Sequence, residues 1–166
     1  MSIHPSSLPR RAFLVSASAL VFSAALPAAL RAQAALSAVM AADEAYKKAI
    51  ANDITLIDIR TPEEWAETGV PEGAIALDMT RQDHFVRTLV TLRKADMAKP
   101  IAMICRTGNR SGYLIKILAA QGFPGLVDVT EGIVGGPRGT GWLPRGLPVY
   151  IGQADEIASR LARIMP

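Results

Sequence analysis

Short apolar runs alternate with helix-forming segments along most of the chain, and this alternation constrains the fold more than any other feature. Strand-like runs are expected at residues 54–57, 74–77, 101–104 and 126–129. Helical spacing is found at residues 41–51, 82–92 and 110–121. Strands that alternate with helices form parallel sheets, because each crossover then holds a helix. The sequence therefore predicts an α/β fold, with a central parallel sheet of about five strands and helices on both faces.

Local signals mark where some of these elements begin and end. Thr61, Pro62 and Glu64 form the pattern of a helix start, with threonine as the cap, proline at the first helical position and glutamate at the third. Asp58 and Cys105 each follow directly on a strand-like run. Parallel sheets place their binding sites at the carboxyl ends of the strands. Both residues are therefore candidates for a functional site.

The basic residues of the chain are unevenly placed. Three of the 18 lysines and arginines, Arg10, Arg11 and Arg31, precede position 35, where there is no acidic residue. The remaining basic residues equal the 15 acidic residues in number, so the pI of about 9.3 arises from the first part of the chain. Because the rest carries no net charge, composition gives no reason to expect a nucleic-acid partner.

Residues 1–34 have the pattern of an export signal. Arg10-Arg11 precedes an apolar run at residues 12–30, and residues 32–34 form a small-x-small cleavage site. The order of the residues around the arginine pair resembles the twin-arginine export signal. The alternatives are an ordinary secretory signal and a leader that stays uncleaved as a membrane anchor. We expect a periplasmic or otherwise exported protein, without stable membrane insertion once the leader is cleaved.

The last residues of the chain are expected to form a short amphipathic helix. Ile157, Leu161 and Ile164 fall on one side of this helix. We expect that side to pack on the protein itself, and the alternative is a face that binds a partner or a membrane. The expected organisation is a leader at residues 1–34, one domain at residues 35–152 and the C-terminal helix at residues 153–166.

The only cysteine, Cys105, lies between the apolar run at residues 101–104 and the next helix, and Gly108 allows a tight loop there. Such a loop directs backbone N–H groups and the positive end of the helix dipole toward the sulfur. A thiolate is stabilised in this setting. Arg106 and Arg110 add positive charge at the two ends of the loop. The alternative is that Cys105 is an inert core residue, as buried free cysteines often are.

Residues 105–111, Cys-Arg-Thr-Gly-Asn-Arg-Ser, resemble the active loop of the rhodanese family of sulfurtransferases. Residues 56–65 resemble the first conserved block of that family. Residues 69–75 resemble its Gly-His-Ile-Pro-Gly-Ala block, with Val70 in place of the histidine and Glu72 added before the glycine. The resemblance implies a single rhodanese-like domain that carries sulfur on its cysteine.

The resemblance also implies a mechanism. The Cys105 thiolate attacks the outer sulfur of a donor such as thiosulfate, and a nucleophile such as cyanide or a thiol then removes the sulfur from the persulfide. Arg106 and Arg110 would guide anionic donors, unless they are ordinary surface charges. Asp58 and Arg60 would brace the loop. The residues implied to bind the substrate are Arg106, Thr107, Gly108, Asn109, Arg110 and Ser111.

The length of the loop separates this chemistry from that of cysteine phosphatases. Those enzymes need a Cys-x5-Arg loop, which is wide enough for a tetrahedral phosphate clamped by the arginine. Here four residues separate Cys105 from Arg110, and Ser111 stands where the phosphatase arginine would be. The smaller ring suits a single transferred sulfur.

No cofactor and no metal are expected, because one cysteine with His4 and His84 cannot supply a zinc site. His84 is expected to be a solvated helix residue. Two classes of function stay open. The protein is either an enzyme that uses small donors and acceptors, or a carrier that passes persulfide sulfur to a partner protein. The partner would dock on a long Gly- and Pro-rich surface loop, residues 135–148, that carries Trp142.

Overall fold

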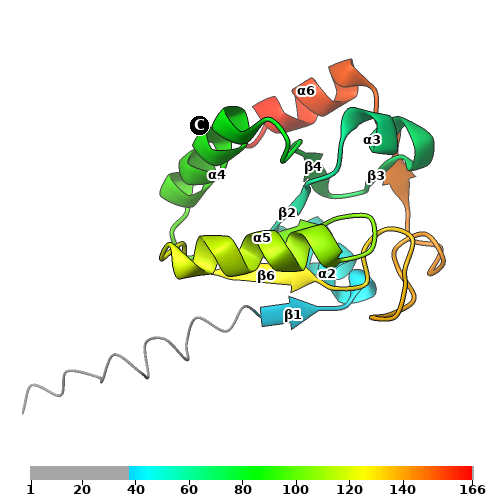
Figure 1. Ribbon diagram of the computed structural model, residues 1–166. Coiled ribbons are helices and arrows are strands. Elements are labelled where there is room, and N and C mark those ends of the chain that lie inside the picture. Colours follow the sequence, from blue (N-terminus) through cyan, green and yellow to red (C-terminus); the bar gives the residue numbers. More distant parts are fainter. Residues whose placement is uncertain (1–37, 166) are drawn as a thin grey trace, which may run out of the picture.

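The computed structural model describes residues 38–165, so the export signal predicted at residues 1–34 lies outside the described residues. Five parallel strands form one sheet in the order β1-β6-β5-β2-β4 (Figure 1). This sheet confirms the predicted α/β fold. The first strand was not anticipated from the sequence. The strands are β1 (Ala38–Met40), β2 (Thr55–Asp58), β4 (Ala74–Ala76), β5 (Ile101–Ile104) and β6 (Leu126–Val129).

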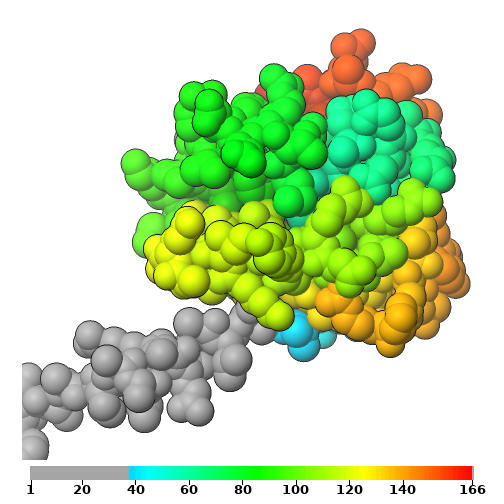
Figure 2. Space-filling view, in the orientation of Figure 1, coloured from blue at the N-terminus to red at the C-terminus, as the bar shows by residue number. Residues whose placement is uncertain are grey.

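Helices cover both faces of the sheet, because alternate strand residues point to opposite sides. In β5, Ile101 and Met103 pack with the side chains of α4 and α5, whereas Ala102 and Ile104 pack with those of α2 and α3. Figure 2 shows that the side chains of α4 and α5 together cover one face of the sheet. The helices are α2 (Ala42–Ile50), α3 (Pro62–Thr68), α4 (Gln82–Ala95), α5 (Asn109–Ala120) and α6 (Ala154–Ala162).

Helix α3 begins as its local sequence predicts. The Thr61 side chain accepts from the backbone of Glu64, and the Glu64 side chain accepts from the Thr61 N–H at 3.3 Å. Pro62 occupies the first helical position, where a missing N–H costs nothing. These contacts fix the start of α3 at the carboxyl end of β2, beside the Cys105 loop.

The segment at residues 135–148 is a mostly exposed loop, as predicted, but Trp142 within it is fully buried. Its ring packs edge-to-face on Tyr46 of α2 at 5.8 Å between centroids. Its indole N–H donates to the Pro148 carbonyl at 2.9 Å, so the one polar atom of the ring has a partner. Trp142 is therefore a core residue. The chain beyond it pairs with the start of the Gly69–Ile75 region as a two-stranded antiparallel sheet, β3 (Val70–Pro71) with β7 (Val149–Tyr150).

Helix α6 lies against the β4 edge of the sheet (Figure 1). Ile157 and Leu161 are partly buried against the core. Arg160 donates to Glu72 at 2.7 Å, and its guanidinium lies 3.7 Å above the centre of the Tyr150 ring. No helix within residues 38–165 is long and apolar enough to cross a membrane.

Candidate active site

Cys105 follows the last residue of β5, and its side chain is turned toward the α4 and α5 face of the sheet. The residue is only 1% exposed. Its sulfur accepts two contacts from Ser111, one from the backbone N–H at 3.4 Å and one from the hydroxyl at 3.5 Å. Both donors belong to the first turn of α5, so the sulfur lies at the positive end of that helix.

Glycine is required at the turn of the loop. Gly108 has φ +78°, in the left-handed region, and an added Cβ would lie 1.9 Å from the Thr130 carbonyl oxygen. The loop is pressed against the chain that follows β6, where the N–H groups of Ile133 and Val134 donate to the carbonyls of Cys105 and Arg106 at 2.9 and 3.0 Å. The contact between this segment after β6 and the Cys105 loop was not predicted from the sequence. Its two hydrogen bonds fix the backbone of the loop at Cys105 and Arg106.

Several backbone N–H groups of the Cys105 loop have no hydrogen-bond acceptor within the described residues. Within residues 38–165, the N–H groups of residues 106–110 donate to no protein atom. Residues 106–108 form the loop before α5, and Asn109 and Arg110 begin the first turn of that helix. Such a run of N–H groups is suited to bind an anion. The Asn109 side chain itself is engaged elsewhere, because it accepts from Arg138 at 2.6 Å, and Arg138 also contacts the Thr107 carbonyl at 3.3 Å.

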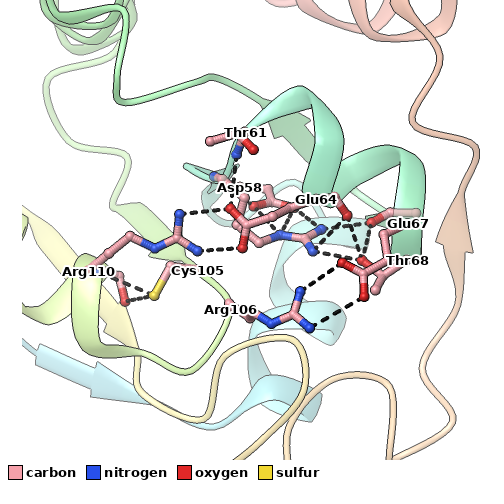
Figure 3. A network of polar contacts seen from close by, with 11 residues as sticks. Asp58, Thr61, Glu64, Glu67, Thr68, Cys105, Arg106 and Arg110 are labelled. Atoms are coloured by element: carbon pink, nitrogen blue, oxygen red, sulfur yellow. Dashed lines mark hydrogen bonds and ion pairs between the residues drawn. The ribbon is translucent and has the colours of Figure 1, made fainter.

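Both arginines of the loop are paired with carboxylates of α3 (Figure 3). Arg110 forms a two-pronged contact with Glu64, at 2.6 and 2.8 Å. Arg106 reaches Glu67 at 2.9 and 3.4 Å. The hydrogen bonds from the arginines hold the pKa of each glutamate below its usual value, and the glutamates raise the pKa of each arginine. All four groups are charged at neutral pH, and their charges cancel.

This pairing changes the expected electrostatics of the site. From the sequence, Arg106 and Arg110 were expected to guide anionic donors as free positive charges, with ordinary surface charge as the alternative. The structure places a carboxylate against each guanidinium, so the two ion pairs add no net charge at the loop. Glu64 was identified from the sequence only as part of a helix cap, and Glu67 was not identified. The one signal for both is their spacing, which puts them on the same face of a short helix.

Asp58, the last residue of β2, and Arg60 form a fully buried ion pair. The Asp58 carboxylate accepts from the Arg60 guanidinium at 2.7, 2.9 and 3.0 Å, and from its backbone N–H at 3.1 Å. Arg60 also donates to the Glu64 carbonyl at 3.2 Å and to Thr68 and the Gly69 carbonyl at 2.7 Å each. These contacts brace α3 rather than the loop itself. The pair acts on the site through the glutamates that α3 carries.

Other ionisable groups contribute less to the site. His84 is half-buried at the start of α4 and has no polar contact with residues 105–111 in the described chain. Asp128, in β6, is 5% exposed, and burial raises its pKa while the nearby Ser111 hydroxyl, Arg138 and Lys116 lower it. Within residues 38–165, no group of three His, Cys, Asp or Glu side chains could hold a metal ion.

Comparison with known proteins defines the class. The rhodanese-like domain family matches residues 41–136, which is more than half of the chain. The protein belongs to the rhodanese family. A sulfurtransferase of Allochromatium vinosum is 30% identical over 99 residues, which cover 58% of this chain and 78% of the relative. A thiosulfate sulfurtransferase of Pseudomonas syringae is 30% identical over 77 residues, which cover 46% and 66%.

A solved structure agrees with this assignment. The crystal structure of a rhodanese-related protein from Thermoplasma volcanium is similar, with 25% identity and a TM-score of 0.51. The similarity covers 69% of this chain and 98% of that one. An uncharacterised protein of Rickettsia prowazekii is 26% identical over 102 residues, which cover 58% of this chain and 83% of the relative. The similarity to the Thermoplasma volcanium structure supports the rhodanese-like fold of the described residues.

Proposed function

We propose that the protein is a sulfurtransferase that moves a sulfane sulfur from a donor such as thiosulfate to a thiophilic acceptor through a persulfide on Cys105. One observation carries the proposal. The Cys105 sulfur lies in a six-residue loop whose N–H groups at residues 106–110 have no acceptor within the described chain. These donors are suited to a persulfide anion or to the oxyanion of a donor. The sulfurtransferases among the relatives support the same class of reaction.

The proposed reaction has two half-steps. In the first, the Cys105 thiolate forms a bond to the outer sulfur of thiosulfate, and the S–S bond of the donor breaks. Sulfite leaves with the electron pair of that bond, and the persulfide stays in the loop. In the second, a thiolate or cyanide bonds to the outer sulfur and Cys105 leaves as the thiolate. Each half-step replaces one bond to sulfur by another, as in other covalent catalysis with two substrates.

The alternative function is a carrier that passes sulfur to a partner protein docked on residues 135–148. Trp142 in that loop is fully buried and cannot contact a partner, whereas most of the loop is exposed. We place the small acceptors cyanide and thiols first in our proposal. An acceptor protein would have to approach the rim of the loop, where Arg106 and Glu67 are partly exposed.

The test is intact mass spectrometry of the protein after incubation with thiosulfate, with Cys105→Ser as the control. Serine is close to cysteine in size, so the fold should persist, but its hydroxyl cannot form a persulfide. We expect one added sulfur in the wild type, its loss on adding cyanide, and no addition to the variant. Thiosulfate:cyanide turnover by folded Cys105→Ser above the uncatalysed rate would contradict the mechanism.

We also propose that residues 1–34 export the protein to the periplasm by the twin-arginine route, which rests on sequence alone. Replacing Arg10 and Arg11 by lysines should leave the protein in the cytoplasm, as cell fractionation would measure. Unchanged periplasmic recovery would exclude this route while leaving an ordinary secretory signal. A wild-type protein that stays in the membrane fraction would instead favour an uncleaved anchor.

A further inference from the structure

The loop that carries Cys105 has two arginines, and one helix supplies a carboxylate to each (Figure 3). We propose that Glu64 and Glu67 are specificity-determining residues, which favour sulfur donors with one negative charge or none, such as alkyl persulfides, over dianionic thiosulfate. The inference rests on the persulfide function proposed above and adds the charge class of the donor.

The two ion pairs differ in how firmly their carboxylates are held. Glu64 is held on both sides, because its carboxylate caps the N–H of Thr61 and also binds both terminal nitrogens of Arg110. A two-pronged contact of this kind fixes the orientation of both groups. Glu67 lies one turn further along α3 and binds Arg106 in a more exposed position. The two carboxylates thus flank the same loop from the same side.

Buried contacts of Arg60 hold α3, the helix that carries both glutamates, in place beside the loop. Arg60 is fully buried and donates to the Glu64 carbonyl, to Thr68 and to the Gly69 carbonyl. Asp58 holds Arg60 in turn. These contacts anchor the whole of α3 from its first turn to its end. Side chains on a braced helix keep their place relative to a bound substrate better than side chains on a loop.

The charges explain the preference. Thiosulfate brings two negative charges to the loop, where each guanidinium is already neutralised by a glutamate. Arg110 is close enough to Cys105 for their charges to interact, so Glu64 offsets the attraction that Arg110 would exert there. A dianion therefore gains little net attraction, because repulsion by the two carboxylates offsets attraction by the two arginines. An alkyl persulfide carries at most one charge, on the sulfur that the backbone N–H groups would bind.

The reaction with such a donor is balanced without a further reagent. The Cys105 thiolate forms a bond to the outer sulfur of R–S–SH, and the S–S bond of the donor breaks. The electron pair of that bond leaves on R–S⁻, and the outer sulfur keeps its proton. The product on the protein is the same persulfide that thiosulfate would give. The two donors can therefore be compared with one readout.

The experiment measures the rate of persulfide formation on Cys105 by intact mass spectrometry, with thiosulfate and with 2-hydroxyethyl persulfide. The variants are Glu64→Gln, Glu67→Gln and the double variant. Glutamine keeps the length of the side chain, and at position 64 it also keeps the helix cap. The matched control is Glu63→Gln, because Glu63 is exposed on the same helix and makes no ion pair among the described residues.

We expect the ratio of the thiosulfate rate constant to the persulfide rate constant to rise about tenfold in the double variant, in the range of charge effects on association. The rise should shrink at high salt, because exposed charges are screened. The control should keep the wild-type ratio.

Three results would overturn the inference alone: an unchanged ratio in the double variant, an equal gain with both donors, or the same rise in Glu63→Gln. The first would show that the pairs do not select by charge, the second that they limit access, and the third that net charge is enough. If neither donor adds sulfur to the wild type or to any variant, the proposed function fails, and this inference fails with it.

Discussion

Replacing Asp58 by asparagine should strongly destabilise the protein, because Asp58 is half of a fully buried ion pair. Asparagine keeps the shape of the side chain but removes its negative charge. Arg60 is 0% exposed and would then hold a buried charge without a counter-ion. Breaking a buried ion pair from one side costs about 3–5 kcal/mol, because the remaining charge stays desolvated.

The other contacts of Arg60 place the cost at the lower end of that range. Its guanidinium keeps three acceptors in α3 and its C-cap, namely the Glu64 carbonyl, the Thr68 hydroxyl and the carbonyl of the C-cap Gly69. We therefore expect a loss of about 3 kcal/mol in the free energy of unfolding. For a domain of roughly 130 residues, 1 kcal/mol corresponds to about 4 °C in Tm, so the Tm should fall by about 11–12 °C.

Thermal and urea unfolding followed by circular dichroism would measure this loss. The matched control is Asp53→Asn, since Asp53 is exposed and its carboxylate has no partner in the described chain. It should change stability by less than about 0.5 kcal/mol. Adding Arg60→Met to Asp58→Asn should recover part of the loss, because no unpaired charge is then buried. A loss below about 1 kcal/mol for Asp58→Asn alone would refute this reasoning.

Trp142→Ala should lower the free energy of unfolding by about 3–5 kcal/mol in urea, as expected for a fully buried tryptophan, and an effect below about 1 kcal/mol would contradict its place in the core. Gly108→Ala should abolish persulfide formation, because the new Cβ meets the Thr130 carbonyl. Wild-type labelling by thiosulfate in that variant would disprove the strained turn. Glu64 has a lowered pKa, so its pairing with Arg110 stabilises the fold above about pH 4.5 and is lost as the pH falls further. The stability gap between wild type and Glu64→Gln in urea should therefore close in acid, and a gap that is constant down to pH 3 would count against the pairing.

By itself the sequence predicted most strands and helices of the main sheet, although not β1, and the position of the proposed nucleophile Cys105. The alternation of strands and helices predicted the parallel sheet, and the cap at Thr61 marked the start of α3. Cys105 could be placed at a strand end with a glycine turn after it. These signals are local, because caps, turns and periodic burial involve residues within a few positions of each other.

Only the tertiary structure decided which charges and rings meet. Glu64 and Arg110 are 46 residues apart in the chain, and Glu67 and Arg106 are 39 apart. They pair because α3 and the Cys105 loop follow neighbouring parallel strands, β2 and β5, whose carboxyl ends lie at one edge of the sheet. The sequence predicted that Trp142 lies in an exposed loop, yet its ring is buried against Tyr46 of α2. Contacts between distant segments depend on strand order and packing, which no local pattern encodes.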